Sequence, residues 1–344
     1  MKHKLSMICA LILAILVVDF GSASAQKKKV AQSGMTYLNI GLSARQSGMG
    51  NASVASVRGE QGLFYNPAAI TQIEDFSLVI NQVNWLVDTH VYGMGAILPI
   101  RNWGTLGLDV VYMDYGTIIG TKRVDKSVDD RGYITTGDIG VEDYAIGLTY
   151  AYAVNDRFSF GTKLKIAHES LGHADYAIGV IDEENDEFVY ANKEWKLNQW
   201  GIDFGGYYDT GFRSLVFAVA FQNFSRDMVY WTEKFQMPLV LKMGLAADMN
   251  QLMNLGFSDV QINASIDAMH PIDYTEQVNL GGELVYKNQF ALRSGYQFNQ
   301  DTENLSFGFG LNFNYSGTVA HLDYSFTQAE YFEDINRFSL SFSF

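Results

Sequence analysis

The sequence predicts an all-β fold: one fourteen-stranded antiparallel β-barrel that crosses a membrane, with an N-terminal segment inside its lumen. Three observations support this expectation. An export signal precedes the rest of the chain, large apolar residues alternate with small or polar ones almost to the last residue, and short links alternate with long ones. A closed barrel is the β-structure that can cross a bilayer, because closure satisfies every backbone hydrogen bond.

The segment 1–25 has the three-part layout of a secretory signal peptide. Lys2 and Lys4 precede an apolar run that ends at Val18, and small residues follow up to residue 25. The alternative is an N-terminal anchor helix, but the run is shorter than the roughly 20 residues that span a bilayer. We therefore expect cleavage before Gln26 and export to the bacterial outer membrane.

Composition limits the chemistry that the exported chain can perform. Cys9 is the only cysteine and lies in the signal peptide, so neither a disulfide nor a cysteine-metal site is expected. Glycine (32), tyrosine (20) and phenylalanine (23) are abundant and proline (4) is scarce, as in barrels with tight turns and aromatic belts. A net charge of -14 without a basic stripe argues against a nucleic-acid partner.

The exported chain divides into two parts. Residues 26–75 are mixed, with many glycines, alanines and serines and no sustained alternation. We expect residues 35–75 to plug the lumen as a hatch, with a short helix at 52–57. Residues 76–344 form the barrel.

Period-two alternation marks the barrel strands. Leu305, Phe307 and Phe309 alternate with Ser306 and Gly308, so one face is large and apolar while the other is small or polar. Most such segments have the length of about 9 to 13 residues that a tilted transmembrane strand needs. An even number of strands closes with both chain ends on one side. The fourteen segments begin near residues 76, 89, 103, 142, 157, 198, 213, 238, 260, 276, 289, 304, 317 and 335.

The links between strands agree with a barrel, because outer-membrane barrels pair short periplasmic turns with longer outer loops. The short links are 101–102, 155–156, 209–212, 287–288 and 316–317, and the long ones are 116–141, 171–197 and 224–237. The link 249–259 departs from this rule, because it is long although its place in the alternation predicts a short periplasmic turn. A soluble β-sandwich is the alternative, but it would carry more charge on the face opposite the apolar one.

Two short motifs stand directly before the first strand, and they resemble the plug signature of FadL-like barrels, most closely in the PorV/PorQ branch. The motif residues are Gly48, Met49 and Gly50, then Asn66, Pro67 and Ala68. The resemblance spans the exported chain and implies a FadL-like barrel in the outer membrane. We expect Asn66 and Pro67 to form the turn that fixes the hatch, a structural role.

The resemblance implies two functions. A PorV-like protein is a component of the type IX secretion system that binds or shuttles cargo proteins with C-terminal sorting domains, with secretion subunits and cargo as partners. FadL relatives instead admit hydrophobic small molecules. Because most lumen positions are polar, the sequence favours the secretion role over a channel for hydrophobic molecules.

The last strand resembles the signal that outer-membrane assembly machinery reads. Phe338, Leu340, Phe342 and Phe344 alternate with serines to the end of the chain. The alternative is an ordinary last strand. Assembly machinery, membrane lipid and lipopolysaccharide are therefore expected partners.

Ionisable residues on the small face are expected to line the lumen. An ion-paired filling of the barrel is the first interpretation, and an ion or substrate path is the second. The ten residues are Asp109, Lys163, Lys165, Asp203, Lys242, Asp267, Glu283, Arg293, His321 and Asp323. The same alternation predicts that Phe309→Arg strongly destabilises the inserted barrel, whereas Gly310→Ser has a mild effect.

Nothing in the sequence predicts an enzyme, a cofactor or a metal centre. His168, Glu169 and His173 are close in sequence, but strand positions five apart point to opposite faces and no third ligand is near. A G-x-S-x-G motif with a histidine base is absent from the sequence.

Overall fold

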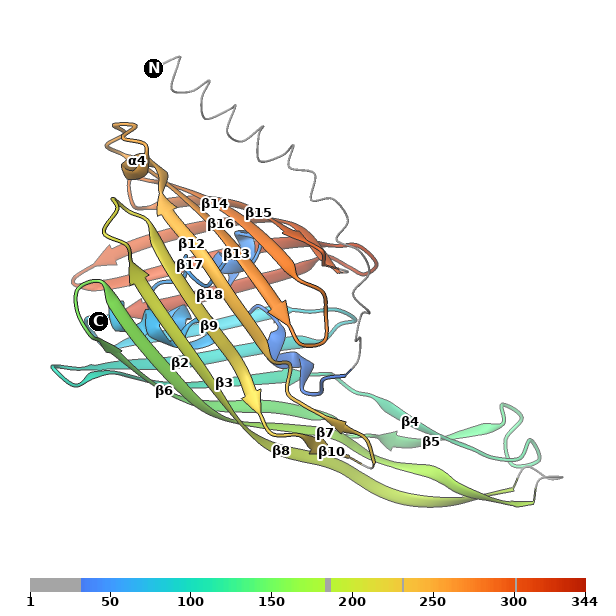
Figure 1. Cartoon of the computed structure of the whole chain (residues 1–344). Coiled ribbons are helices and arrows are strands. Elements are labelled where there is room, and N and C mark those ends of the chain that lie inside the picture. The colour runs from blue at the N-terminus through green and yellow to red at the C-terminus, as the bar shows by residue number, and fades with distance from the viewer. Residues whose placement is uncertain (1–31, 183–186, 231, 301) are drawn as a thin grey trace.

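The computed structural model describes residues 32–182, 187–230, 232–300 and 302–344. The expected signal peptide and its cleavage site before Gln26 lie outside these residues. Within them, fourteen strands close into one antiparallel barrel in which each strand is hydrogen-bonded to two neighbours, which confirms the predicted fold class (Figure 1). The closing seam joins the first and last strands, from Ser77 opposite Ser343 to Asn84 opposite Asn336.

The observed strands begin within three residues of the expected positions, except for β8, which begins eleven residues earlier than residue 198. The barrel strands are β1 (Ser77–Asn84), β2 (His90–Ile100), β3 (Gly104–Asp114), β6 (Glu142–Ala153), β7 (Phe158–Asp182), β8 (Glu187–Asp209), β9 (Val216–Ser225), β12 (Val240–Asp248), β13 (Val260–Pro271), β14 (Gln277–Tyr286), β15 (Phe290–Phe298), β16 (Glu303–Tyr315), β17 (Thr318–Ala329) and β18 (Ile335–Ser343).

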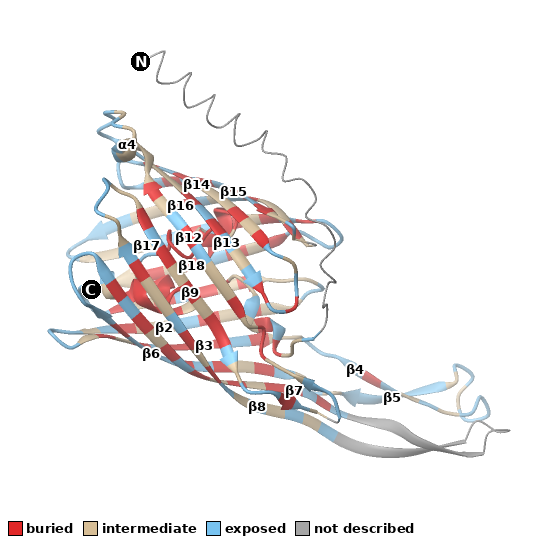
Figure 2. Ribbon diagram, in the orientation of Figure 1, coloured by how far each residue is buried: buried red, intermediate tan, exposed pale blue. Residues whose placement is uncertain are grey.

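Burial alternates along the strands, as Figure 2 shows. On β6, Ile146 and Leu148 are exposed on the outer surface, whereas Ala145 and Thr149 are buried toward the lumen. The outer surface therefore carries a belt of large apolar side chains, which suits contact with lipid.

All three long links contain strands that the sequence did not predict. β7 and β8 remain paired far beyond the barrel, up to Asp182 opposite Glu187, so the interpretation of 171–197 as a loop is wrong. Beside them, β4 (Ile119–Arg123) pairs with β5 (Tyr133–Asp138). We call β4, β5 and the projecting parts of β7 and β8 the arm (Figure 1). The alternation of apolar and polar residues did not reveal these strands, because a hairpin that projects into water needs no apolar face toward lipid.

Two smaller elements complete the links. The link 224–237 contains the pair β10 (Met228–Val229) and β11 (Lys234–Phe235). The link 249–259, which follows β12, contains the short helix α4 (Met249–Leu252).

The hatch fills the lumen with short helices separated by turns. They are η1 (Thr36–Asn39), α2 (Ala44–Gly48), η2 (Gly59–Gln61), α3 (Gly62–Tyr65) and η3 (Pro67–Gln72). Among the described residues, no helix is long and apolar enough to cross a membrane.

The helix expected at 52–57 is wrong, because this stretch forms turns. The backbone N–H groups of Ser53 and Val54 donate to the Asp267 carboxylate of the barrel wall, the latter over 2.7 Å. In this stretch, hydrogen bonds to the barrel wall therefore replace the backbone hydrogen bonds that a helix would make.

The two ends of the barrel differ. The short links and the strand ends at Ser77 and Ser343 lie at one end, which in outer-membrane barrels faces the periplasm. The arm and the long links surround the other end, the mouth. The described chain starts at the mouth, where the Gly34 N–H donates to the Gln236 carbonyl over 3.0 Å. We call residues 33–42, which run from the mouth into the lumen, the strap.

Candidate functional site

Glycines of the first motif let the hatch backbone touch the barrel wall. A Cβ at Gly48 would lie 2.9 Å from the Gly308 Cα, and one at Gly50 would lie 2.6 Å from the Tyr296 backbone nitrogen. Gly50 also has a φ of 63°, which side-chain-bearing residues rarely adopt. Gly295 of the wall lies opposite Gly50, and a Cβ there would also collide with the hatch backbone. The motif therefore brings the hatch backbone into direct contact with the wall backbone.

The second motif forms the turn that starts η3. The buried Asn66 side chain accepts from the Ala68 N–H over 3.1 Å and donates to the Val54 carbonyl over 3.1 Å. Pro67 occupies the first helical position, where no N–H is needed. Gly161 of the wall leaves room for it, since a Cβ there would lie 2.4 Å from the Pro67 carbonyl carbon.

The structure brings the ten expected lumen residues to the inner side of the barrel, where eight are buried and Lys242 and His321 are half-buried. Two buried ion pairs join neighbouring strands. Lys163 Nζ lies 2.6 Å from Asp109 Oδ2, and Lys165 Nζ lies 2.8 Å from Asp203 Oδ2.

A larger ionic group ties the hatch to the wall. Glu283 binds Arg45 of α2 at 2.8 Å and Arg293 at 2.7 Å, and Arg293 binds Asp323 at 2.6 Å. Sequence reasoning missed Arg45, because hatch residues have no strand alternation to reveal their direction. It also missed the buried pair of Arg337 with Glu303, although parity on the last strand could have revealed that arginine.

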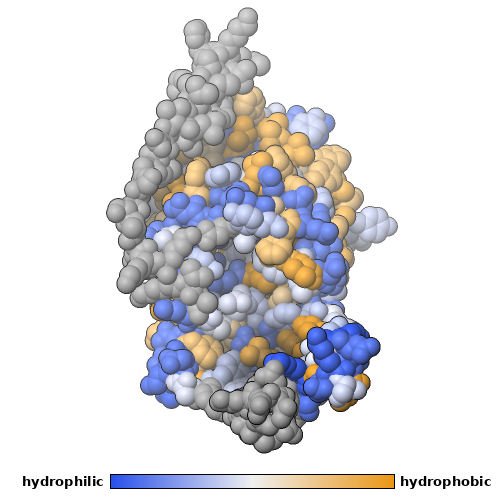
Figure 3. All heavy atoms as spheres, turned by 90° about the vertical axis from the view of Figure 1, so that its right-hand side faces the viewer, coloured by the Kyte–Doolittle hydropathy of each residue, from blue (hydrophilic) through white to orange (hydrophobic). Residues whose placement is uncertain are grey.

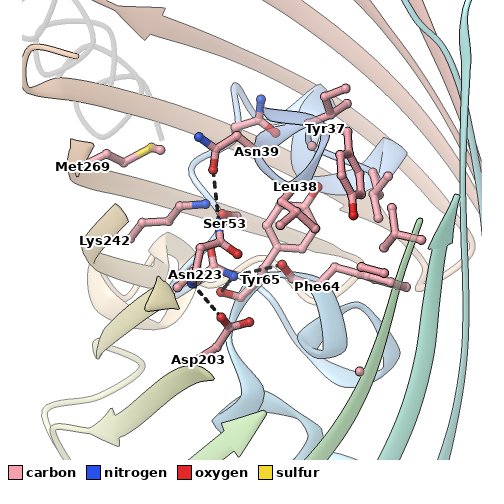
Figure 4. Close-up of a pocket in the computed structure, with 18 of the residues that line it drawn as sticks. Tyr37, Leu38, Asn39, Ser53, Phe64, Tyr65, Asp203, Asn223, Lys242 and Met269 are labelled. Atoms are coloured by element: carbon pink, nitrogen blue, oxygen red, sulfur yellow. Dashed lines mark hydrogen bonds between the residues drawn. The ribbon is translucent and has the colours of Figure 1, made fainter. Parts of the chain in front are cut away.

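The described residues line a cavity on each side of the hatch. The upper cavity, of about 90 Å³, lies toward the mouth between the strap, the hatch and the wall, and its lining includes Leu38, Tyr65 and Lys242 (Figure 4). The lower cavity, of about 910 Å³, lies toward the periplasmic end, and its lining includes Arg45 and His321. The two linings share no residue, so the hatch separates the cavities.

Buried and half-buried hydrogen bonds fasten the strap at the mouth. The Met35 N–H donates to Glu169 over 2.7 Å, and the Tyr230 hydroxyl donates to the same carboxylate over 2.9 Å. The Tyr37 hydroxyl donates to the Tyr144 carbonyl over 2.6 Å. Burial first, and then nearby carboxylates, raise the pKa of Tyr37 and of Tyr230 far above the ordinary value, so both hydroxyls remain donors.

His168, Glu169 and His173, which are close in sequence, make separate contacts. The ring of His168 lies on the outer surface, where it stacks on Tyr144 at 4.8 Å and contacts Asn198 at 2.8 Å. Glu169 points inward to the strap. The His173 backbone N–H donates to the Ile139 carbonyl at the base of the arm.

The wall beside the upper cavity contains an irregularity. The pairing of β8 with β9 shifts register between Ile202 and Phe204, and Asn223 has a φ of 65°. The Asn223 N–H donates to the Asp203 carboxylate over 2.7 Å instead of to the neighbouring strand. This bulge locally interrupts the wall near the cavity. The β16–β17 pairing has a second register shift, between Glu303 and Ser306, and Glu303 also lines the cavity.

The expected assembly signal lies on β18 with its aromatic side outward. Phe338 is exposed on the outer surface, and Phe344 stacks on Phe76 at 6.1 Å across the seam. Recognition by assembly machinery stays a prediction.

Comparisons with known proteins give the fold a family context. The chain is similar to the toluene transporter TodX of Pseudomonas putida, with 14% identity and a TM-score of 0.56 over 88% of this chain and 98% of that one. It is similar to the toluene transporter TbuX of Ralstonia pickettii, with 14% identity and a TM-score of 0.54 over 88% and 97%. A FadL homologue of Pseudomonas aeruginosa matches with 11% identity and a TM-score of 0.51 over 86% and 96%.

These likenesses show that the chain has the FadL-like barrel fold. They do not single out the PorV/PorQ branch that the sequence motifs suggested. No family model matches the chain. No curated protein matches it either.

Proposed function

We propose that the protein is a bacterial outer-membrane channel that admits small organic molecules, as a FadL-like channel for hydrophobic compounds does. One observation carries this proposal: the hatch, held in place by hydrogen bonds and ion pairs, separates two cavities inside a closed barrel. A barrel with a purely structural role would have no need of a cavity on each side of the plug.

The comparisons support this function over the one that the sequence favoured. TodX and TbuX are named as toluene transporters, and a further similar structure is named as the monoaromatic hydrocarbon channel CymD. The apolar outer belt supports residence in a membrane, and the aromatic last strand supports delivery by the outer-membrane assembly machinery.

Passage requires a route past the hatch. One route displaces the hatch toward the lower cavity, and the other leaves through the wall at the β8–β9 bulge beside Asp203 and Asn223. Displacement breaks the Arg45–Glu283 ion pair, whereas lateral exit leaves it intact.

Uptake measurements test the channel function. In cells that lack the gene, complementation with wild type should restore uptake of radiolabelled toluene, and Pro67→Gly should change the rate by loosening the turn at Asn66. Shortening the arm by removing residues 173–194 serves as the control and should leave uptake unchanged. Uptake that is the same with and without the protein would rule the channel out.

A second candidate function, cargo binding in type IX secretion, is favoured by the arm. β7 and β8 project from the mouth as a long paired hairpin with β4 and β5 beside them, and the face around the mouth is mostly hydrophilic (Figures 1 and 3). Such a projection is suited to contact with another protein. Secretion of proteins with C-terminal sorting domains, measured in the same strains, separates the candidates: arm removal should abolish secretion only if this second function is the true one.

A further inference from the structure

Lys242 of β12 extends into the upper cavity without a charged partner. In Figure 4 its amine points toward Asn39 and Ser53. The ammonium lies 6.0 Å from the centre of the Tyr65 ring. It has neither a hydrogen bond nor an ion pair with any residue that the structure describes.

The neighbouring carboxylates are already engaged by other groups. Asp109 binds Lys163 and Asp203 binds Lys165, so these charges cancel in pairs. Asp267 accepts from two backbone N–H groups of the hatch. The Asp267 carboxylate keeps its charge, because its donors are neutral N–H groups, but among the described residues no carboxylate lies within ion-pair distance of Lys242. An ammonium without a direct partner in a lumen of this kind is costly unless an anion contacts it.

Neutral polar groups of the same cavity are also free to bind a ligand. Asn279 and Gln297 are buried and line the cavity, and among the described residues the Asn279 Oδ1 and the Gln297 Nε2 have no hydrogen-bond partner. Apolar side chains of the strap and hatch, including Leu38 and Phe64, form another part of the lining. The cavity thus combines an ammonium, one amide donor, one amide acceptor and an apolar surface.

We propose that the upper cavity binds a compact organic anion, a carboxylate on a small apolar body, with Lys242 binding the carboxylate. The inference rests on the proposed channel function and narrows its substrate class from neutral hydrocarbons to small acids. A volume of about 90 Å³ has room for roughly six waters at about 15 Å³ each. A space of this size suits one substituted ring better than a long alkyl chain.

Binding to the purified full-length barrel tests the inference, with benzoate as the anionic probe and benzyl alcohol as its neutral analogue. By titration calorimetry, wild type should bind benzoate at least about tenfold more tightly than benzyl alcohol, the scale of one charge-assisted contact. Lys242→Met should remove that preference and leave benzyl alcohol binding unchanged, while Lys242→Arg should keep it. The matched control is Lys196→Met, which removes an exposed lysine paired with Glu194.

Three outcomes would overturn the inference: equal binding of both probes, a benzoate preference that survives Lys242→Met, or tighter binding of palmitate than of benzoate. Heat-dependent gel mobility shows whether each variant is a folded barrel, and Lys242→Gln replaces Lys242→Met if that variant fails to fold. Because binding needs no transport, the two ideas fail separately. Toluene uptake without Lys242-dependent benzoate binding rejects only the inference, and Lys242-dependent benzoate binding without uptake of either toluene or benzoate rejects only the channel.

Discussion

At the scale of single residues, glycines decide where the hatch meets the wall. Gly50 combines a left-handed backbone with a wall contact so close that no Cβ fits, whereas Gly256 has a similar φ of 77° and open space around it. The two positions therefore separate the cost of backbone strain from the cost of a lost contact.

Gly50→Ala should destabilise the protein more than Gly256→Ala. Both variants carry the strain of a left-handed alanine, about 1–2 kcal/mol, but only Gly50→Ala also pushes the hatch from β15, adding about 1–3 kcal/mol. Thermal unfolding of the detergent-solubilised protein, followed by circular dichroism, measures both. Equal melting temperatures would mean that the hatch does not depend on this contact.

Phe309→Arg tests which side of the wall faces lipid. Phe309 is exposed on the outer surface of β16, so arginine there should cost about 2–4 kcal/mol and reduce insertion. Asn314→Arg is the matched control, because Asn314 lies on the same strand and lines the lower cavity. Comparable amounts of both variants in purified outer membranes would contradict the assignment of faces.

Gly310→Ser, which alternation makes a mild change, would meet the buried ion pair of Arg293 with Asp323. A Cβ at Gly310 would lie 2.5 Å from Asp323 Oδ1 and 2.7 Å from an Arg293 nitrogen. Alternation reveals the face on which a residue lies, but it does not reveal how crowded that face is. For this reason the lumen residues could be predicted from sequence, and their partners and the cavities between them could not.

At the scale of elements, the short helix α2 fastens the hatch through one side chain. Arg45 reaches Glu283 from α2, while Arg58 is exposed and, within the described chain, has no ion pair. Asn66 and Pro67 could be singled out from sequence because a turn has a local signature. The Arg45–Glu283 pair joins positions 238 residues apart, and no local pattern encodes it.

Arg45→Met should loosen the hatch and raise ion conductance through the barrel. Arg45 is only partly buried and Glu283 keeps Arg293, so we expect a loss of about 1–3 kcal/mol of hatch anchoring. Conductance of single proteins in planar lipid bilayers measures the effect, with Arg58→Met as the control. A conductance unchanged by Arg45→Met and raised by Arg58→Met would show that the ion pair is not the anchor.

At the scale of the whole molecule, the start of the described chain and the end of the last strand lie at opposite ends of the barrel. The strap begins at the mouth beside Gln236, and β18 ends with the short links at the other end. The strand number could be predicted from alternation, but the direction of the strap could not, since it follows from contacts with Glu169 and Gln236 that are distant in sequence.

An epitope inserted between Gln32 and Ser33 should be accessible on intact cells. Antibody labelling of whole cells should detect it, whereas the same epitope after Phe344 should be detected only once the outer membrane is permeabilised. Labelling of the second epitope alone on intact cells would reverse the assigned orientation of the barrel.

The strap also constrains the order in which the molecule is built. It runs from the mouth into the lumen, and the β1–β18 seam closes the barrel around it and the hatch, with Ser77 opposite Ser343. If the barrel closed first, the N-terminal segment would have to enter the closed lumen afterwards. In the simpler order of assembly, an open, curved sheet wraps around a hatch that is already in position. The pairing of β1 with β18, which joins the most distant strands in the sequence and is therefore the slowest to form, then encloses the hatch.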